Sequence, residues 1–179
     1  KFIYAYWNEP DSTMHRKGTG STEAHQVITA LEKKIEEFAD SLSDTLLFIT
    51  ADHSHIDCQN LCILDYPEVL ETLERMPAME PRTLNLFVKK EYRDRFPTIF
   101  QKAFGDKLLL LTRDEVLSKK LFGIGRQRDG LQDLIGDFVA VSTSDTAVFI
   151  THYEAQTMPG GHAGMTEEEY RIPLIVIDN

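Results

Sequence analysis

The sequence predicts an α/β fold in which a mostly parallel sheet carries a smaller inserted α+β lobe. Three short runs of consecutive apolar residues predict the strands of the sheet: residues 2–7, 45–50 and 172–177. Consecutive apolar positions are typical of strands that are buried on both faces of a parallel sheet. An amphipathic stretch between the first two runs predicts a helix, which supplies the right-handed crossover that two parallel strands require.

The crossover helix is predicted over residues 22–42. Within this stretch Val27, Leu31 and Ile35 recur at helical spacing and form one apolar face. Ser21 stands directly before the stretch, where a serine side chain can accept a hydrogen bond from the first turn of a helix. The helix therefore has both a buried face and a start signal.

The middle of the chain, residues 56–158, predicts the smaller lobe, because it reads as shorter elements broken by prolines and glycines. Its candidate strands and its candidate helix are residues 84–88, 108–112, 138–141 and 146–150, and residues 91–104. Residues 1–55 and 159–179 then form the α/β core. We find no internal repeat, which excludes the repeat architectures.

Composition limits the classes of function. The 179 residues, 42% of them hydrophobic, are enough to build a core. The 29 acidic and 19 basic residues give a net charge of −10, which argues against binding of nucleic-acid polymers through broad electrostatic attraction. No stretch approaches the roughly 20 consecutive apolar residues of a membrane span. A phosphate-containing substrate must then be held locally, and a bound metal ion is the obvious means.

Both ends of the chain are unusual for a complete protein. The chain lacks an initiator methionine, opens directly into an apolar run and closes in a run that resembles a strand. We therefore expect a piece of a longer protein, with an amino-terminal part missing before Lys1.

Three clusters of potential metal ligands each stand next to one of the three predicted strands. Asp11 and His15 follow the first strand, Asp52 and His53 follow the second, and His162 lies in a glycine-rich turn before the third. Loops at the carboxyl ends of parallel strands face a common crevice, so side chains far apart in sequence can converge there. Carboxylate oxygens and imidazole nitrogens are ligands that suit Zn²⁺.

Each cluster also has a simpler interpretation. Asp11 can cap a helix in a solvated loop, Asp52 and His53 can form a plain hydrogen-bonded pair, and His162 can lie in a flexible turn. Such patterns occur by chance when they stand alone. The metal interpretation depends on all three clusters meeting in space.

Taken together, the three motifs resemble those of the type I phosphodiesterase/nucleotide pyrophosphatases, a family of the alkaline-phosphatase superfamily. They are an Asp-Ser-x-x-His loop at residues 11–15, an Ala-Asp-His-Ser motif at residues 51–54, and a Gly-x-His-Ala-Gly-Met loop at residues 160–165 that leads to a Pro-Leu-Ile strand. The order matches that of the family over nearly the whole chain. The resemblance implies part of an alkaline-phosphatase-like three-layer sandwich.

The resemblance also implies a ligand set. The residues matching Asp11, His15 and His162 hold one zinc ion, and those matching Asp52 and His53 hold a second. Zinc fits these donors better than magnesium does, and manganese is the alternative. His55, two residues beyond His53, either orients a ligand or meets substrate, or is a solvated loop histidine.

The implied activity is hydrolysis of a small phosphate-ester or nucleotide substrate through two divalent ions and a covalent phospho-enzyme. The family's nucleophile and a further aspartate ligand both lie upstream of the position of Lys1, so this chain has no catalytic nucleophile and we expect it to be inactive alone. A phosphoglycerate mutase, or a sulfatase or phosphonate hydrolase, of the same superfamily is the alternative enzyme class. A metal-binding domain without chemistry is the alternative outside enzymes.

Overall fold

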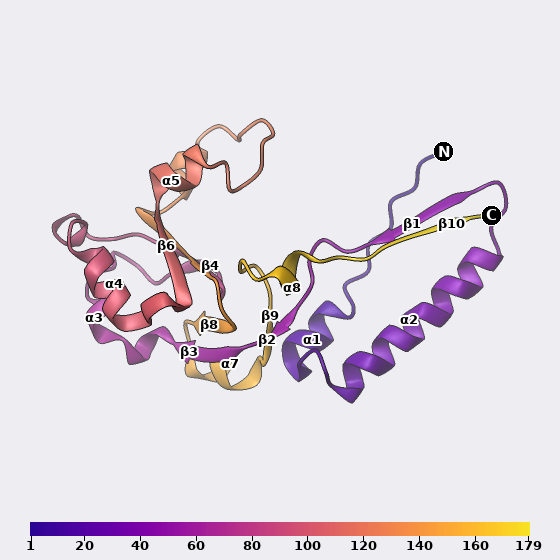
Figure 1. Cartoon of the computed structure of the whole chain (residues 1–179), viewed down its shortest axis with the longest axis horizontal. Helices are drawn as coiled ribbons and strands as arrows, with labels where there is room; N and C mark the ends of the chain where they lie inside the picture. The colour runs from indigo at the N-terminus through magenta and orange to yellow at the C-terminus, as the bar shows by residue number, and fades with distance from the viewer.

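The computed structural model describes residues 1–179 and is elongated, with two unequal parts joined by thin connections (Figure 1). We refer to residues 56–158 as the lobe; their separation from the core as a domain stays a prediction. The other part contains α1 (Asp11–Lys17), α2 (Thr22–Asp40), β1 (Leu46–Thr50), α8 (Glu167–Tyr170) and β10 (Leu174–Asp178). Both chain termini lie at the end of the molecule that is far from the lobe. No helix combines the length and the apolar character that a membrane crossing requires.

A long hairpin-like ribbon forms the part outside the lobe. β1 pairs with β10 in antiparallel register, from Leu46 opposite Asp178 to Thr50 opposite Leu174. The chain enters the lobe after β1 and returns from it before β10, so the two strands necessarily run in opposite directions (Figure 1). The α/β class is confirmed. These two strands run antiparallel, although the sequence predicts a mostly parallel sheet.

Residues 2–7, predicted to form the first strand, form none. They are extended coil, and Phe2 and Trp7 are 92% and 65% exposed. The strand–helix–strand crossover is therefore not formed within this chain. The predicted burial of the other two runs is also not met by the chain's own residues, since Phe48 of β1 and Leu174 of β10 are mainly exposed.

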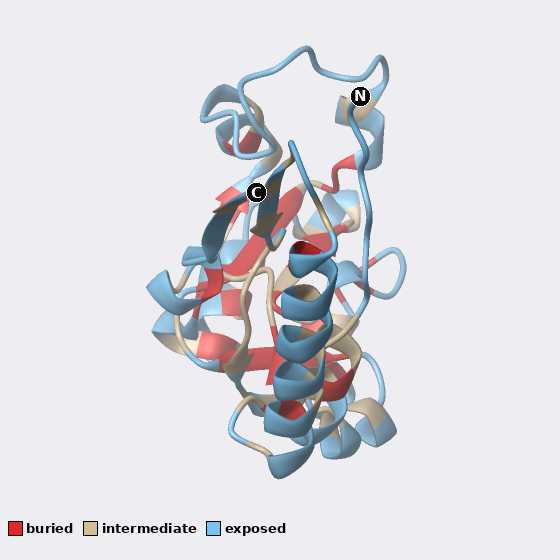
Figure 2. Ribbon diagram, turned by 90° about the vertical axis from the view of Figure 1, so that its right-hand side faces the viewer, coloured by how far each residue is buried: buried red, intermediate tan, exposed pale blue.

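The predicted helix is confirmed as α2, which ends two residues earlier than expected. The Ser21 hydroxyl accepts a hydrogen bond from the backbone N–H of Ala24, as an N-cap should. Only Ala24 and Ala39 of this helix are buried. Figure 2 accordingly shows α2 as exposed along most of its length, with the buried segments behind it.

The lobe is built on a four-stranded antiparallel sheet in the order β4-β5-β7-β6. These strands are β4 (Ala78–Glu80), β5 (Thr83–Leu86), β6 (Leu108–Thr112) and β7 (Phe138–Ser142). A second sheet pairs β3 (Gln59–Cys62) with β8 (Thr146–Phe149) in parallel, the one parallel pair of the chain. The four predicted strands of the lobe are thus confirmed within a few residues.

The helices and the remaining short elements of the lobe surround these sheets. They are η1 (Ile63–Asp65), α3 (Pro67–Leu70), η2 (Lys90–Tyr92), α4 (Phe96–Phe104), η3 (Gly105–Lys107), α5 (Arg113–Ser118), α6 (Leu131–Leu134) and α7 (His152–Thr157). The helix predicted over residues 91–104 begins later, at Phe96, because Pro97 favours the first turn of a helix.

The main hydrophobic core lies inside the lobe. Phe96, Phe100 and Phe104 place three buried rings on one face of α4, and Phe96 packs against Phe138 of the sheet at 5.1 Å between ring centroids. Thirteen buried residues form this cluster, all between residues 63 and 148. The lobe therefore contains the best-packed part of the chain, and the ribbon and α2 extend from it.

Candidate metal centre

The three ligand clusters meet where the ribbon joins the lobe. The first turn of α1 begins at Asp11 and carries His15 one turn later, so both side chains lie on the same face of the helix. The second cluster follows the end of β1. β2 (Ile56–Asp57) pairs with β9 (Gly160–Gly161), with Ile56 opposite Gly161. This antiparallel register places His55 opposite His162, directly beyond the paired residues.

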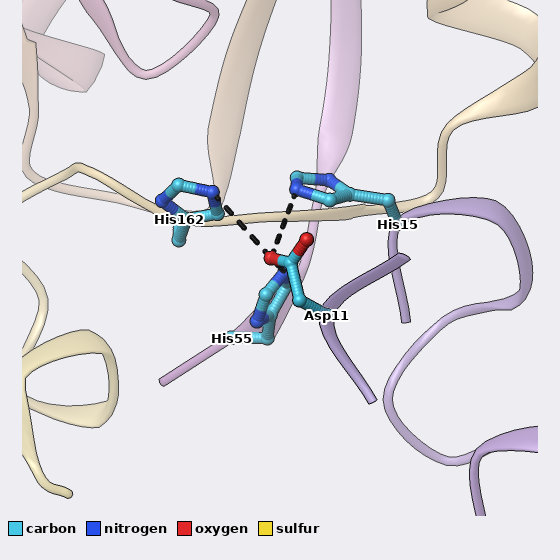
Figure 3. Close-up of side chains that lie close together, drawn as sticks. All are labelled: Asp11, His15, His55 and His162. Carbon is cyan, nitrogen blue, oxygen red and sulfur yellow. Dashed lines mark ion pairs between the residues drawn. The ribbon is translucent and has the colours of Figure 1, made fainter. Parts of the chain in front are cut away.

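One carboxylate oxygen lies at the centre of four histidines. Asp11 Oδ1 is 3.3 Å from His55 Nε2 and 3.4 Å from His15 Nε2. The Nε2 atoms of His53 and His162 each lie 3.9 Å from the same oxygen. Figure 3 shows His15, His55 and His162 arranged around Asp11. One ligand atom from each of these four residues lies within 4.8 Å of the others, so the four residues form a group that could hold one metal ion.

The backbone fixes how His15 presents its nitrogens. His15 Nδ1 lies 3.0 Å from the carbonyl oxygen of Gly160. A carbonyl can only accept, so Nδ1 must carry the hydrogen and, in the neutral ring, Nε2 keeps a free lone pair. His15 Nε2 lies 3.4 Å from Asp11 Oδ1 and is therefore free to bind a metal ion beside that oxygen.

Burial gives the centre its electrostatic character. Asp11 Oδ1 and His55 Nε2 are both buried and neither has a hydrogen-bond partner. Burial, helped by the neighbouring histidines, lowers the pKa of His55 to about 4 and that of His162 to about 4. Both rings are therefore neutral at neutral pH, the state in which imidazole binds metal.

A divalent cation fits this donor set. Each buried polar atom left unsatisfied costs about 1–3 kcal/mol, and a cation among these residues contacts the carboxylate oxygen and the imidazole nitrogens together. One carboxylate and several imidazoles form a donor set typical of zinc. The orphaned oxygen of Asp11 is thus the observation that favours an ion here.

The five predicted ligands are not equally placed. Asp11, His15 and His162 belong to the central group, and His53 lies beside it with its ring stacked on that of His162 at 3.7 Å between centroids. Asp52 is on the rim, 71% exposed, with Oδ1 3.7 Å from His53 Nε2. The division of these residues between two ions stays a prediction.

Sequence reasoning gave His55 only an accessory role. In the structure its side chain is 4% exposed and its Nε2 makes the shortest approach to Asp11 Oδ1. A signal was present in the sequence, because His53 and His55 are two residues apart and extended chain places such residues on one side. The register between β2 and β9, which aligns His55 with His162, has no such signal.

Close packing against α1 and against Arg82 explains two glycines around His162. A Cβ on Gly160 would lie 2.3 Å from the carbonyl oxygen of Met14, which belongs to α1. A Cβ on Gly164 would lie 2.5 Å from Arg82 Nη2. Glycine at these positions lets the turn carrying His162 approach α1 on one side and the lobe on the other.

A buried ion pair anchors the same turn to the lobe. Arg82, fully buried directly before β5, donates through Nε to Glu169 Oε1 and through Nη2 to Glu169 Oε2, both at 2.7 Å. Glu169 also accepts hydrogen bonds from the backbone N–H groups of Gly164 and Thr166. Burial opposes ionisation of Glu169, but these hydrogen bonds outweigh it and lower its pKa to about 2.

The family model described as type I phosphodiesterase/nucleotide pyrophosphatase matches residues 1–165. The chain belongs to this family. No curated protein sequence matches it.

Solved structures with the same fold include two phosphodiesterases and one phosphonate hydrolase. Murine ectonucleotide pyrophosphatase/phosphodiesterase 5, an inactive variant in complex with AMP, is 18% identical with a TM-score of 0.71, over 94% of this chain and 45% of that chain. The human protein is 16% identical with a TM-score of 0.71, over 96% and 45%. Phosphonoacetate hydrolase from Sinorhizobium meliloti, with phosphonoformate, is 19% identical with a TM-score of 0.64, over 93% and 43%.

These likenesses confirm the predicted alkaline-phosphatase-like fold. At below 20% identity they show the fold alone. The chain spans about 45% of the length of the first two of these proteins.

Proposed function

We propose that this chain is the metal-binding part of a phosphoric ester hydrolase that acts on a small phosphodiester or nucleotide substrate through two divalent ions. Membership of the phosphodiesterase family supports the reaction class. The observation that carries the proposal is the buried group of Asp11, His15, His55 and His162, in which the Asp11 oxygen has no hydrogen-bond partner.

The two proposed ions have different ligands in this chain. Asp11, His15 and His162 hold the first, and their donor atoms already converge. Asp52 and His53 hold the second, and their exposed side leaves room for donors from another segment. Zinc is the metal that this mixture of carboxylate and imidazole favours, with manganese as the alternative.

The charges of the chain's own side chains suit the binding of cations, which in turn bind a phosphate ester. The neutral rings of His55 and His162 offer lone pairs without adding positive charge, and Asp11 contributes one negative charge where cations bind. Divalent ions, when bound, supply Lewis acidity that stabilises negative charge on a phosphoryl group. Because the net charge of −10 repels a phosphate, substrate binding depends on that local positive charge.

We infer that the nucleophile and the last aspartate ligand come from the part of the relatives that this chain does not span. The hydroxyls nearest to these clusters, those of Thr13 and Ser54, do not stand in the position of the family's nucleophile. The isolated chain should then bind metal without turning substrate over. A threonine in the upstream segment indicates a diesterase, a serine a mutase, and a cysteine or serine in a sulfatase motif a sulfatase.

The likeness to phosphonoacetate hydrolase, with a TM-score of 0.64, supports phosphonate hydrolysis as a second candidate. The two candidates share the metal centre and differ in the bond that breaks, P–O in a phosphodiester and P–C in a phosphonate. Assaying the longer protein with both substrate types separates them.

The test combines metal content with turnover. We expect the 179-residue chain to retain zinc after dialysis, measured by mass spectrometry, and to lose it in Asp11→Ala and His162→Ala. The matched control is His25→Ala, an exposed histidine of α2, which should keep full metal content. Hydrolysis of bis-p-nitrophenyl phosphate that persists in both ligand variants and rises in proportion to protein mass would overturn the site assignment.

A further inference from the structure

We propose that His55 is a direct ligand of the first ion, so that Asp11, His15, His55 and His162 form a complete four-residue set within this chain. This inference rests on the proposed function, since it concerns the same ion. It changes the role of His55 from a residue near the site to one that contacts the metal. It also changes the prediction for the isolated chain, because no donor from another segment is needed to fill this coordination shell.

Strand register places the His55 ring where a ligand must be. Ile56 of β2 pairs with Gly161 of β9, so the next residues outward, His55 and His162, lie opposite each other at the end of this strand pair. Their ring centroids lie 5.0 Å apart, and those of His55 and His15 lie 4.7 Å apart. Two imidazoles bound to one ion need this kind of separation with their nitrogens turned inward, as Figure 3 shows.

The environment of His55 Nε2 argues against an orienting role. An orienting histidine donates or accepts a hydrogen bond from a ligand group. His55 Nε2 approaches Asp11 Oδ1 to 3.3 Å, yet neither atom has a hydrogen-bond partner. A buried polar atom without a hydrogen-bond partner destabilises the fold. A cation bound by both atoms gives each of them a partner.

The consequence is a site with four protein ligands. Structural zinc sites are typically closed by four protein groups, whereas catalytic sites keep one position open for water or substrate. The first ion therefore holds together α1, the segment after β1 and the glycine turn of β9. Any substrate contact at this ion requires a fifth ligand or the release of one of the four.

The experiment counts imidazoles on the metal. X-ray absorption of the zinc-loaded 179-residue chain should show three imidazole ligands and one oxygen ligand in the wild type, and two imidazoles in His55→Ala and in His55→Gln. His55→Gln preserves side-chain bulk, so it separates ligand loss from a packing defect. Cobalt(II) in the wild type should show the intense visible bands of four-coordinate geometry, and these bands should weaken in both variants.

Affinity gives a second readout. Outer residues that only orient a ligand typically change metal affinity about 10–100-fold, so loss of a direct ligand should weaken zinc binding by more than about 100-fold. His25→Ala should leave affinity unchanged. Circular dichroism confirms that each variant retains the wild-type secondary structure.

The outcomes separate this inference from the proposed function. The role of His55 is overturned if zinc has two imidazole ligands in both the wild type and His55→Gln, and if only Asp11→Ala and His162→Ala lose zinc affinity. The proposed function would still stand. Absence of zinc binding in the wild type overturns both.

Discussion

Replacing Glu169 by alanine should loosen the turn that carries His162, although Glu169 itself does not contact the candidate ligands. Its carboxylate holds Arg82 on one side and the backbone N–H groups of Gly164 and Thr166 on the other. The substitution leaves the Arg82 guanidinium fully buried without its anionic partner, and frees the N–H groups that define the turn.

The expected loss is large. Removing one member of a buried ion pair typically costs about 3–5 kcal/mol, because the remaining charge stays desolvated. Arg82 retains hydrogen bonds to the carbonyl oxygens of Ser144 and Thr146, at 2.8 and 2.9 Å, which keep the loss within this range. For a chain of this length, the loss corresponds to a fall in Tm of about 6–20 °C, at roughly 2–4 °C per kcal/mol.

Urea unfolding followed by circular dichroism measures the loss, and zinc affinity measures its effect on the site. Glu168→Ala is the matched control, since Glu168 is the exposed neighbour on the same short helix. We expect Glu169→Ala to lose both stability and zinc affinity, and Glu168→Ala to lose neither. If the two variants have free energies of unfolding within about 0.5 kcal/mol of each other, the range of ordinary surface substitutions, the anchoring role is refuted.

Three further perturbations follow from the same structure. Folding lowers the pKa of His55 to about 4, so the unfolded chain binds more protons than the folded chain between pH 6.5 and about 4. The free energy of unfolding of the metal-free chain should therefore fall as the pH drops through this window. Urea titrations at several pH values measure it, and a free energy of unfolding that does not change with pH contradicts the burial of His55. Gly160→Ala forces its Cβ against the α1 backbone at 2.3 Å and should weaken zinc binding, whereas Gly20→Ala, with nothing within 4 Å, should not. Phe100→Ala should cost about 3–5 kcal/mol in urea unfolding, and Phe48→Ala, 59% exposed, much less; equal losses would place the core elsewhere.

Local patterns allowed the helix and the strands of the lobe to be predicted from sequence. The start of α2 is encoded by Ser21, whose hydroxyl caps the first turn, and its face by apolar residues at helical spacing. The predicted strand at residues 108–112 coincides with β6. These signals act between neighbouring residues, so the rest of the chain was not needed to interpret them.

Long-range pairing could not be predicted in the same way. An apolar run such as residues 2–7 is equally compatible with a buried strand and with exposed extended chain, and only a pairing partner decides between them. No strand of this chain pairs with it. The direction of β10 against β1 is likewise set by how the intervening lobe returns the chain, which periodicity does not reveal.

In the candidate site, too, residues in local motifs could be predicted from sequence, and a residue placed by long-range pairing could not. The motifs around Asp11 and His162 identified residues that the fold brings together, because each motif carries its own local geometry of helix turn or glycine turn. His55 was undervalued because its position depends on β2 and β9, two strands of two residues each and about a hundred residues apart in the sequence. Strands this short carry no periodic signal.

The position of the site suggests what an ion does for the fold. His162 belongs to a turn that Glu169 ties to the well-packed lobe, whereas Asp11 and His15 lie on α1, in the part of the chain that buries few residues. A cation held by both sides cross-links the weakly packed part to the well-packed lobe. A ligand that binds only the folded state stabilises that state. Zinc should therefore slow hydrogen exchange at the backbone amides of α1, which the ion holds, more than at those of α4. Equal protection of the two helices would mean that α1 is already held by its own packing.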